Sequence, residues 1–325
     1  MRKNASWIAV AVLWTAFSAS VAAEEGTAAE AGGRWQGTDG SYLPFRTDLE
    51  ILAFLRDAEA TLVKEITSGI NRPLKLLLNR DGVTAHAIFR TVDVRKTRFV
   101  SNKKVYLDFR DSHVFECAAY EVSRLLGIDA VPPCVERRVW GKSGSLQLWV
   151  ENAVTEEKRR KEKKKAPASL PWVRQQQTLR LFDALIKNVD RNQGNMLIDE
   201  RWKLWFIDHT RSFHRSPEVE GIERIIWCER EIWEKLKALD REALEERAGD
   251  YLNSSEIRLV LERRDRLVRH MKERIAAVGE NIVLYSADTA PPEGFESHPD
   301  FAAASDSGED IPEKSEELEG GGVPI

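Results

Sequence analysis

Apolar residues in the middle of the chain follow two different spacings. Residues 74–78 and 84–89 are short apolar runs separated by turn residues that include Gly82, which predicts two β-strands joined by a tight turn. Residues 112–126 and 175–187 instead carry apolar side chains three and four positions apart, which predicts two amphipathic helices. The pattern therefore indicates a chain of mixed strands and helices.

A second pair of short strands follows the second helix. Residues 195–198 and 203–207 read as strands, and residues 199–201 form a turn between them, which predicts a β-hairpin. A β-hairpin brings its last residues back beside its first residues. We therefore expect Asp208 to lie beside Asn195.

The side chains around this hairpin suit phosphoryl transfer. Asn195 and Asp208 follow Asp190 by five and eighteen positions. Moving a γ-phosphoryl group depends mostly on positioning and on metal ions that neutralise charge. Asn195 and Asp208 are the candidate ligands of Mg2+ or Mn2+, and Asp190 is the candidate catalytic residue that orients or deprotonates an acceptor hydroxyl. The loop is also ordinary turn chemistry, because Asn, Asp and Gly favour turns.

A wider stretch of sequence resembles a known group of enzymes. Residues 116–122 and the loop up to Pro132 resemble the corresponding helix and loop of type II phosphatidylinositol 4-kinases and related atypical kinases, the phosphatidylinositol 3-/4-kinase-like group. Residues 190–195 and 207–213 are similar to the catalytic and metal-binding loops of that group. HipA-like kinases and the Golgi secretory kinases share the general pattern, which covers about residues 74–213.

The resemblance implies an α+β, two-lobed protein-kinase-like fold, with a small β-rich N-lobe and a mainly helical C-lobe. It also implies that ATP is the nucleotide. Glu116 takes the place of the helix Glu that pairs with a nucleotide-binding Lys, and Thr84 lies where a hydroxyl could contact a phosphate. On the residues alone, Glu121 competes with Glu116, which lies near the edge of the apolar helix face.

Two positions depart from the pattern of these kinases. Arg90 stands where a strand normally ends in Phe-Lys-Pro. Its guanidinium can fork onto phosphate or carboxylate, but Arg and Lys are not interchangeable at such a site. His209 and Thr210 follow Asp208 where these kinases usually carry a Gly. Neither departure removes a candidate metal ligand.

Residues 144–151 predict a strand that runs into a connection between the lobes. In a kinase this is the hinge that contacts adenine. Gln147, Trp149 and Val150 are therefore candidate nucleotide-binding residues. An ordinary edge strand explains the same residues equally well.

Length and composition are consistent with a two-lobed domain. The 325 residues carry a formal charge of -4, which gives no drive toward nucleic acid. We expect the N-lobe at residues 42–150 and the C-lobe at residues 151–285, where helical spacing over residues 224–278 completes the core. Residues 152–171 predict a mobile charged loop, which could alternatively guide an acidic substrate or a phospholipid headgroup.

Both ends of the chain predict non-globular segments. Residues 1–23 combine basic, apolar and small residues in the order of a signal peptide, and a retained anchor is the alternative. Residues 24–41 predict a flexible segment and residues 286–325 a disordered acidic tail. No other segment is expected to span a membrane. Because of the signal peptide, we expect a periplasmic or secreted protein. At most one disulfide can form among the three cysteines, Cys117, Cys134 and Cys228.

The sequence thus predicts a secreted, metal-dependent atypical kinase that transfers phosphate from ATP to a hydroxyl of a protein or small-molecule acceptor. One alternative is a relative that transfers AMP, because Arg90 could seat the nucleotide differently. Another is a pseudokinase that binds nucleotide as a binding module. Since ATP is scarce outside the cytoplasm, the phosphate donor remains open.

Overall fold

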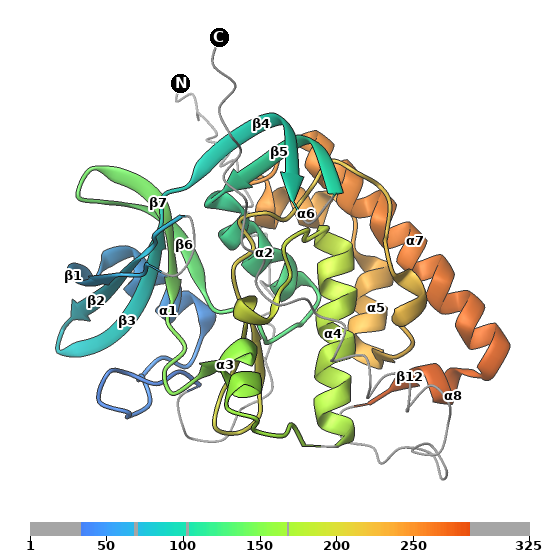
Figure 1. The fold of residues 1–325 in the computed structure, drawn as a ribbon, viewed down its shortest axis with the longest axis horizontal. Coiled ribbons are helices and arrows are strands. Elements are labelled where there is room, and N and C mark those ends of the chain that lie inside the picture. The colour runs from blue at the N-terminus through green and yellow to red at the C-terminus, as the bar shows by residue number, and fades with distance from the viewer. Residues whose placement is uncertain (1–33, 68–70, 102–103, 168, 287–325) are drawn as a thin grey trace, which may run out of the picture. The chain divides into compact units, whose positions relative to one another are not determined.

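A five-stranded antiparallel sheet forms the N-terminal part of the fold (Figure 1). The computed structural model describes residues 34–67, 71–101, 104–167 and 169–286, which belong to one unit of the chain. The strands occur in the spatial order β1 (Glu59–Glu65), β2 (Leu74–Arg80), β3 (Val83–Arg90), β7 (Lys142–Leu148) and β6 (Cys134–Val139).

The predicted strand pair is the β2–β3 hairpin. Its register runs from Leu74 opposite Phe89 to Arg80 opposite Val83. The two turn residues, Asp81 and Gly82, both have positive φ angles (53° and 81°), as tight hairpin turns require. Alternate residues point to the core, namely Leu76, Leu78, Ala85, Ala87 and Phe89.

Helix α1 (Asp48–Asp57) packs on this sheet through contacts with β2, β6 and β7. It begins with a capping box, in which Thr47 accepts from the backbone of Glu50 and the Glu50 side chain accepts from the backbone of Thr47. Its buried residues are Ile51, Leu52, Phe54 and Leu55. The segment before it is also packed: Trp35 is buried and Gln36 bridges to Tyr42.

Helix α2 (Val114–Leu125) contacts β6 and β7 on the sheet and α6 (Arg241–Ala248) in the helical region. A disulfide joins Cys117 of α2 to Cys134 of β6, with the two Cα atoms 4.9 Å apart. Cys228 is the free, buried cysteine. The helix that carries Glu116 is therefore tied covalently to the sheet.

The disulfide gives a testable prediction for stability. Replacing both Cys117 and Cys134 by Ser should lower the free energy of unfolding by about 3 kcal/mol, because a loop of this length no longer restricts the unfolded chain. Urea titration followed by Trp fluorescence measures the change. Dithiothreitol should lower the free energy of unfolding of the wild type by a similar amount. It should leave the unfolding midpoint of the double variant unchanged. A wild type that is insensitive to the reductant would contradict the prediction.

A separate two-stranded hairpin links the sheet to α2. It consists of β4 (Asp93–Ser101) and β5 (Lys104–Ser112), and it was not anticipated from the sequence. It extends from the sheet over the helical region (Figure 1). Its Phe99 and Phe109 rings stack with centroids 4.0 Å apart, while one face leaves valines and a leucine exposed.

The C-terminal part is mainly helical. The long helices α4 (Leu170–Ile186) and α7 (Ser254–Val278) pack together, with α5 (Arg230–Ala238) and α6 against α7. Short elements complete it: α3 (Glu156–Lys161), α8 (Glu280–Val283), β8 (Val154–Thr155), β9 (Met196–Ile198), β10 (Leu204–Phe206), β11 (Cys228–Glu229) and β12 (Leu284–Tyr285). Among the described residues, no helix is long and apolar enough to cross a membrane.

The predicted fold class is confirmed: an antiparallel-sheet region precedes a helical region. Two of the predicted non-core segments contain ordered elements. Residues 34–41 of the expected flexible segment pack against the core through Trp35, and the charged run over residues 152–171 contains α3, where Glu156 is buried against Arg159. The exact lobe boundaries stay predictions. The expected signal peptide and nearly all of the expected acidic tail lie outside the described residues.

Candidate functional site

The segment after α4 is organised by one side chain, Arg191. Its guanidinium donates to both carboxylate oxygens of Asp183 on α4, at 2.8 and 2.9 Å. It also donates to the backbone oxygens of Asn195 and Ile207. A nitrogen of the same group lies 3.2 Å from Nε2 of His209. One residue thus joins α4, the loop before β9 and the segment after β10.

The hairpin β9–β10 brings Asn195 and Asp208 to the same end. Met196 pairs with Phe206, and the backbone N–H of Ile207 donates to the carbonyl of Asn195 at 3.3 Å. The Asn195 amide nitrogen donates to the carbonyl of Asp190 at 2.9 Å, so its oxygen is the atom left for a ligand. Asp208 has a φ of 60°, and the Thr210 hydroxyl donates to its Oδ1 at 3.3 Å. The predicted hairpin thus places Asp208 beside Asn195 and Asp190.

A buried ion pair joins the sheet to this loop. Nε of Arg90, at the end of β3, lies 3.4 Å from Oε1 of Glu116 on α2. Glu116 is fully buried rather than at the edge of the helix face, and Arg90 is 5% exposed. The backbone N–H of His209 donates to the same Oε1 at 3.0 Å, and the His209 ring approaches Oε2 at 3.5 Å. Glu116 therefore holds the residue directly after Asp208.

Glu116 remains an acid of lowered pKa despite its burial. Burial alone raises the pKa of a carboxyl group, because a charge loses its hydration. The charge of Arg90 and the hydrogen bonds from His209 act in the opposite direction, and together they bring the pKa of Glu116 below its ordinary value. The carboxylate is thus kept ionised by its two partners.

Removing Arg90 should therefore be costly. We expect Arg90→Ala to lower the free energy of unfolding by about 3–5 kcal/mol, because it leaves a buried charge without its counter-ion. Arg90→Lys should restore much of that loss. Arg138→Ala on β6 is a matched control, since Arg138 is exposed. Equal unfolding midpoints for Arg90→Ala and Arg138→Ala in urea would contradict the prediction.

Asp190 has neighbours that the sequence did not point to. Arg211 donates to Asp190 at 3.4 Å and to Asp111, at the end of β5, at 2.8 Å. Asp111 is buried and also accepts from the side chain of Asn71. Asp190 is only partly exposed. Arg211 thus lies between the candidate catalytic carboxylate and a second, buried carboxylate.

Thr84 and Gln147, two of the remaining predicted nucleotide-binding residues, form hydrogen bonds with other parts of the protein. Thr84 is at the opposite end of β3 from Arg90, about 20 Å away at the rise of a strand, and its hydroxyl pairs with that of Thr38 at 2.7 Å. Gln147 is buried, and its amide donates to the carbonyl of Pro132 at 3.3 Å. These side chains already have partners within the protein.

The end of β7 presents a different set of groups. The Lys75 ammonium lies 4.2 Å from the centre of the Trp149 ring, and Val150 is buried. His86 and Glu151 approach to 2.6 Å beside them. The pKa of Lys75 is lowered by burial, against the opposing charge of Glu151. The roles of Thr84, Gln147, Trp149 and Val150 toward a nucleotide stay predictions.

The donor set at Asn195 and Asp208 fits a hard divalent cation. No group of three or more His, Cys, Asp or Glu side chains within the described parts of the chain is arranged to hold a metal. Mg2+ does not need one, because it is usually held by one or two carboxylates together with waters and substrate phosphates. The Asp208 carboxylate and the Asn195 amide oxygen would supply the protein's share of such a site.

Solved structures share this arrangement of sheet and helices. A structure of hydra Fam20 with sugar matches with a TM-score of 0.57 and 16% identity, over 75% of this chain and 95% of that chain. The Golgi casein kinase with Mn/ADP bound matches with a TM-score of 0.51 and 15% identity, over 77% and 82%. This chain has the fold of these kinases.

A second structure of the Golgi casein kinase gives a TM-score of 0.52 at 15% identity, over 76% of this chain and 80% of that chain. No family model and no curated protein sequence matches the chain. The similarity to the solved structures confirms the atypical kinase-like fold. The finer grouping with type II phosphatidylinositol 4-kinases and HipA-like kinases stays a prediction.

Proposed function

We propose that this protein is a metal-dependent phosphotransferase that moves the γ-phosphoryl group of ATP to a hydroxyl of a protein or small-molecule acceptor. The observation that carries the proposal is the chain of contacts from Arg90 through Glu116 to the backbone of His209, next to Asp208. In kinases a basic residue of the sheet must pair with a helix Glu while an Asp holds the metal.

Each residue has a role in the proposed reaction. Arg90, fixed by Glu116, would bind the phosphates, and Asn195 and Asp208 would hold Mg2+ or Mn2+. The metal would neutralise charge on the phosphates. Asp190 would orient the acceptor hydroxyl and take its proton as the new oxygen–phosphorus bond forms. The bond between the γ-phosphorus and its bridging oxygen breaks, and ADP leaves.

The neighbours support this choice of cofactors. The Golgi casein kinase was solved with Mn/ADP bound, and it shares the fold of this chain. A nucleotide and a divalent metal therefore suit this fold. The acceptor has no comparable support, so protein and small-molecule hydroxyls are both retained.

Export through a signal peptide is part of the proposal. The disulfide between Cys117 and Cys134 supports it, because such bonds persist mainly in oxidising compartments. Incubation of cell fractions with a thiol-blocking reagent should find these two cysteines protected in the exported protein. Protein that accumulates in the cytoplasm with both thiols reactive would argue against export.

Labelled ATP tests the reaction. Purified protein is incubated with a mixture of candidate protein and small-molecule acceptors, Mg2+ or Mn2+, and ATP labelled at either the α- or the γ-phosphorus. Transfer of the γ-label alone supports the kinase. Transfer of the α-label identifies the alternative that moves AMP. That alternative arises because Arg90 stands in place of the usual Lys. Metal-dependent binding of ATP without transfer of either label identifies a nucleotide-binding pseudokinase.

A further inference from the structure

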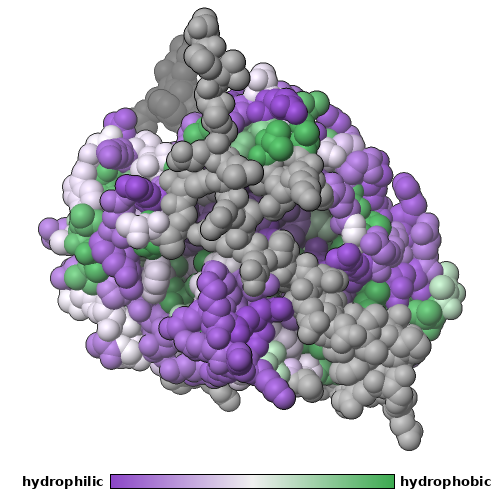
Figure 2. Space-filling model, viewed as in Figure 1, coloured by the Kyte–Doolittle hydropathy of each residue, from purple (hydrophilic) through white to green (hydrophobic). Residues whose placement is uncertain are grey.

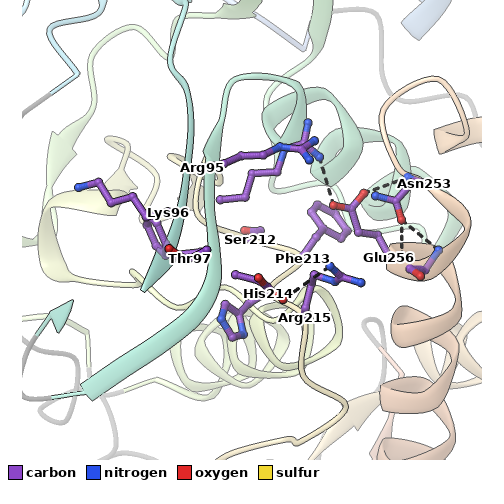
Figure 3. A pocket seen from close by; sticks show the side chains of 13 residues that line it. Arg95, Lys96, Thr97, Ser212, Phe213, His214, Arg215, Asn253 and Glu256 are labelled. Carbon is purple, nitrogen blue, oxygen red and sulfur yellow. Dashed lines mark hydrogen bonds and ion pairs between the residues drawn. The ribbon is translucent and has the colours of Figure 1, made fainter. Parts of the chain in front are cut away.

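A basic pocket lies beside the proposed active site and takes no part in the proposed function. It has a volume of about 480 Å³ and lies between the β4–β5 hairpin, residues 212–215 and the start of α7 (Figure 3). Arg211, which contacts Asp190, directly precedes its lining residue Ser212. An occupant of this pocket would therefore lie next to the candidate catalytic loop.

The pocket has an excess of positive charge. Two of its cations are paired: Arg110 with Glu256 at 3.1 Å and Arg215 with Asp108 at 3.7 Å. These pairs account for the pocket's two carboxylates. Arg95 and Lys96 also line the pocket, and among the described residues neither has a carboxylate partner within ion-pair distance. The pocket thus offers two cations to an anionic group.

A buried hydroxyl also lacks a partner here. Ser212 lines the pocket and is 1% exposed, and its Oγ has no hydrogen-bond partner in the described parts of the chain. Buried polar groups are usually hydrogen-bonded, and a hydroxyl can donate as well as accept, so Ser212 is able to donate to an acceptor that enters the pocket. A carboxylate is an acceptor with the sign of charge that the pocket requires.

The outer surface of the β4–β5 hairpin is apolar as well as basic. Val100, Val105 and Leu107 are 51%, 52% and 64% exposed, and they lie on one face of the hairpin because Val100 pairs with Val105. Figure 2 shows hydrophobic surface next to hydrophilic surface in the region of β4 and β5. The occupant that fits this surface therefore combines acidic and apolar residues.

We propose that the acidic C-terminal segment of this chain, residues 306–319, binds in this pocket in cis. Seven of its residues are Asp or Glu, against one basic residue, Lys314. Ile311 and Leu318 supply apolar side chains among these acids. The charge and the apolar content of the segment thus match those of the pocket and of the hairpin above it.

The segment is long enough to reach the pocket. The pocket lies at the start of α7, and the chain leaves α7 at its far end, about 38 Å away for a helix of 25 residues. Between Ser286 and the segment lie about 20 residues, which span up to about 66 Å when extended. A flexible chain of 20–33 residues has a mean span of roughly 22–34 Å. The covalent connection therefore gives the segment a high effective concentration at the pocket, which favours binding in cis.

Zero-length cross-linking of the full chain tests the proposal. A carbodiimide joins a carboxylate to a lysine amine with loss of water, so it should link Lys96 to acidic residues of the segment. We expect these links to dominate over links to Lys163, Lys165 and Lys272, which lie in the charged run and on α7. In 0.5 M salt their yield should fall several-fold, because exposed charges are screened.

Variants make the test specific. Arg95→Glu should reduce the Lys96 cross-links at least threefold, whereas Lys272→Glu, an exposed reversal on α7, should leave them unchanged. Replacing the seven acidic residues by Asn and Gln should abolish them. In a mixture of 14N- and 15N-labelled protein, each linked pair should carry a single isotope. Links at Lys163 or Lys165 equal to those at Lys96, or pairs of mixed isotope that indicate a second copy, would overturn the proposal. None of these readouts depends on kinase activity.

Discussion

We expect the Asp208→Asn variant to bind ATP no better with Mg2+ or Mn2+ than without metal. The substitution removes the one carboxylate of the candidate metal site and leaves only neutral amide oxygens, which should hold the cation weakly. The loss should exceed about 100-fold in metal-dependent affinity, because changes to groups one shell further out already cost 10- to 100-fold. Asn tolerates the positive φ of position 208, so the backbone should be preserved.

Calorimetric titration of the protein with ATP, with and without the metal, measures this effect. The matched control is Asp199→Asn, at the closed end of the same hairpin, where Asp199 accepts from the backbone N–H of Arg201 and of Lys203. This control should bind Mg2+-ATP as the wild type does. Retained metal-dependent binding in Asp208→Asn would place the metal ligands elsewhere in the protein.

The second large effect concerns the transfer step. Asp190→Asn should keep the metal-dependent binding of ATP and lower the rate of γ-phosphoryl transfer by about 10²- to 10⁴-fold, the range expected for loss of a general base. The amide keeps the shape of the carboxylate, and Arg211 can still donate to its oxygen. The variant therefore separates binding from chemistry.

Rates with γ-labelled ATP, measured beside binding by calorimetry, distinguish the two outcomes. Glu200→Gln, at an exposed position in the hairpin turn, is the control and should transfer at the wild-type rate. An Asp190→Asn protein that transfers phosphate normally would remove Asp190 from the reaction. A variant that has lost both binding and transfer would instead indicate a structural role for Asp190.

The parts of the fold that the sequence predicted are those encoded by local spacing. The β2–β3 strands and the β9–β10 hairpin carry short apolar or alternating runs, helix α2 carries apolar residues three and four positions apart, and each element is present in the structure. The approach of Asp208 to Asn195 followed from hairpin geometry alone. Such elements can be predicted from the sequence because the residues that determine them are close together in the chain.

The contacts that were not foreseen join residues that are distant in sequence. Arg191 binds residues of three segments, and Arg211 joins Asp190 to Asp111, 100 positions before it. A lone Arg in a polar loop carries no pattern that distinguishes a buried organiser from a solvated charge. The burial of Glu116 was missed for a similar reason, since its partner His209 comes from a distant loop.

The covalent link between α2 and the sheet has a consequence for control of the protein. Many kinases are switched off when the helix that bears the conserved Glu moves away from the sheet and breaks its ion pair. Here Cys117 adjoins Glu116, and its bond to Cys134 ties α2 to β6, which should restrain such a motion. We therefore expect the oxidised protein to keep Arg90 and Glu116 paired, so that regulation of the proposed kinase would act on access to the site.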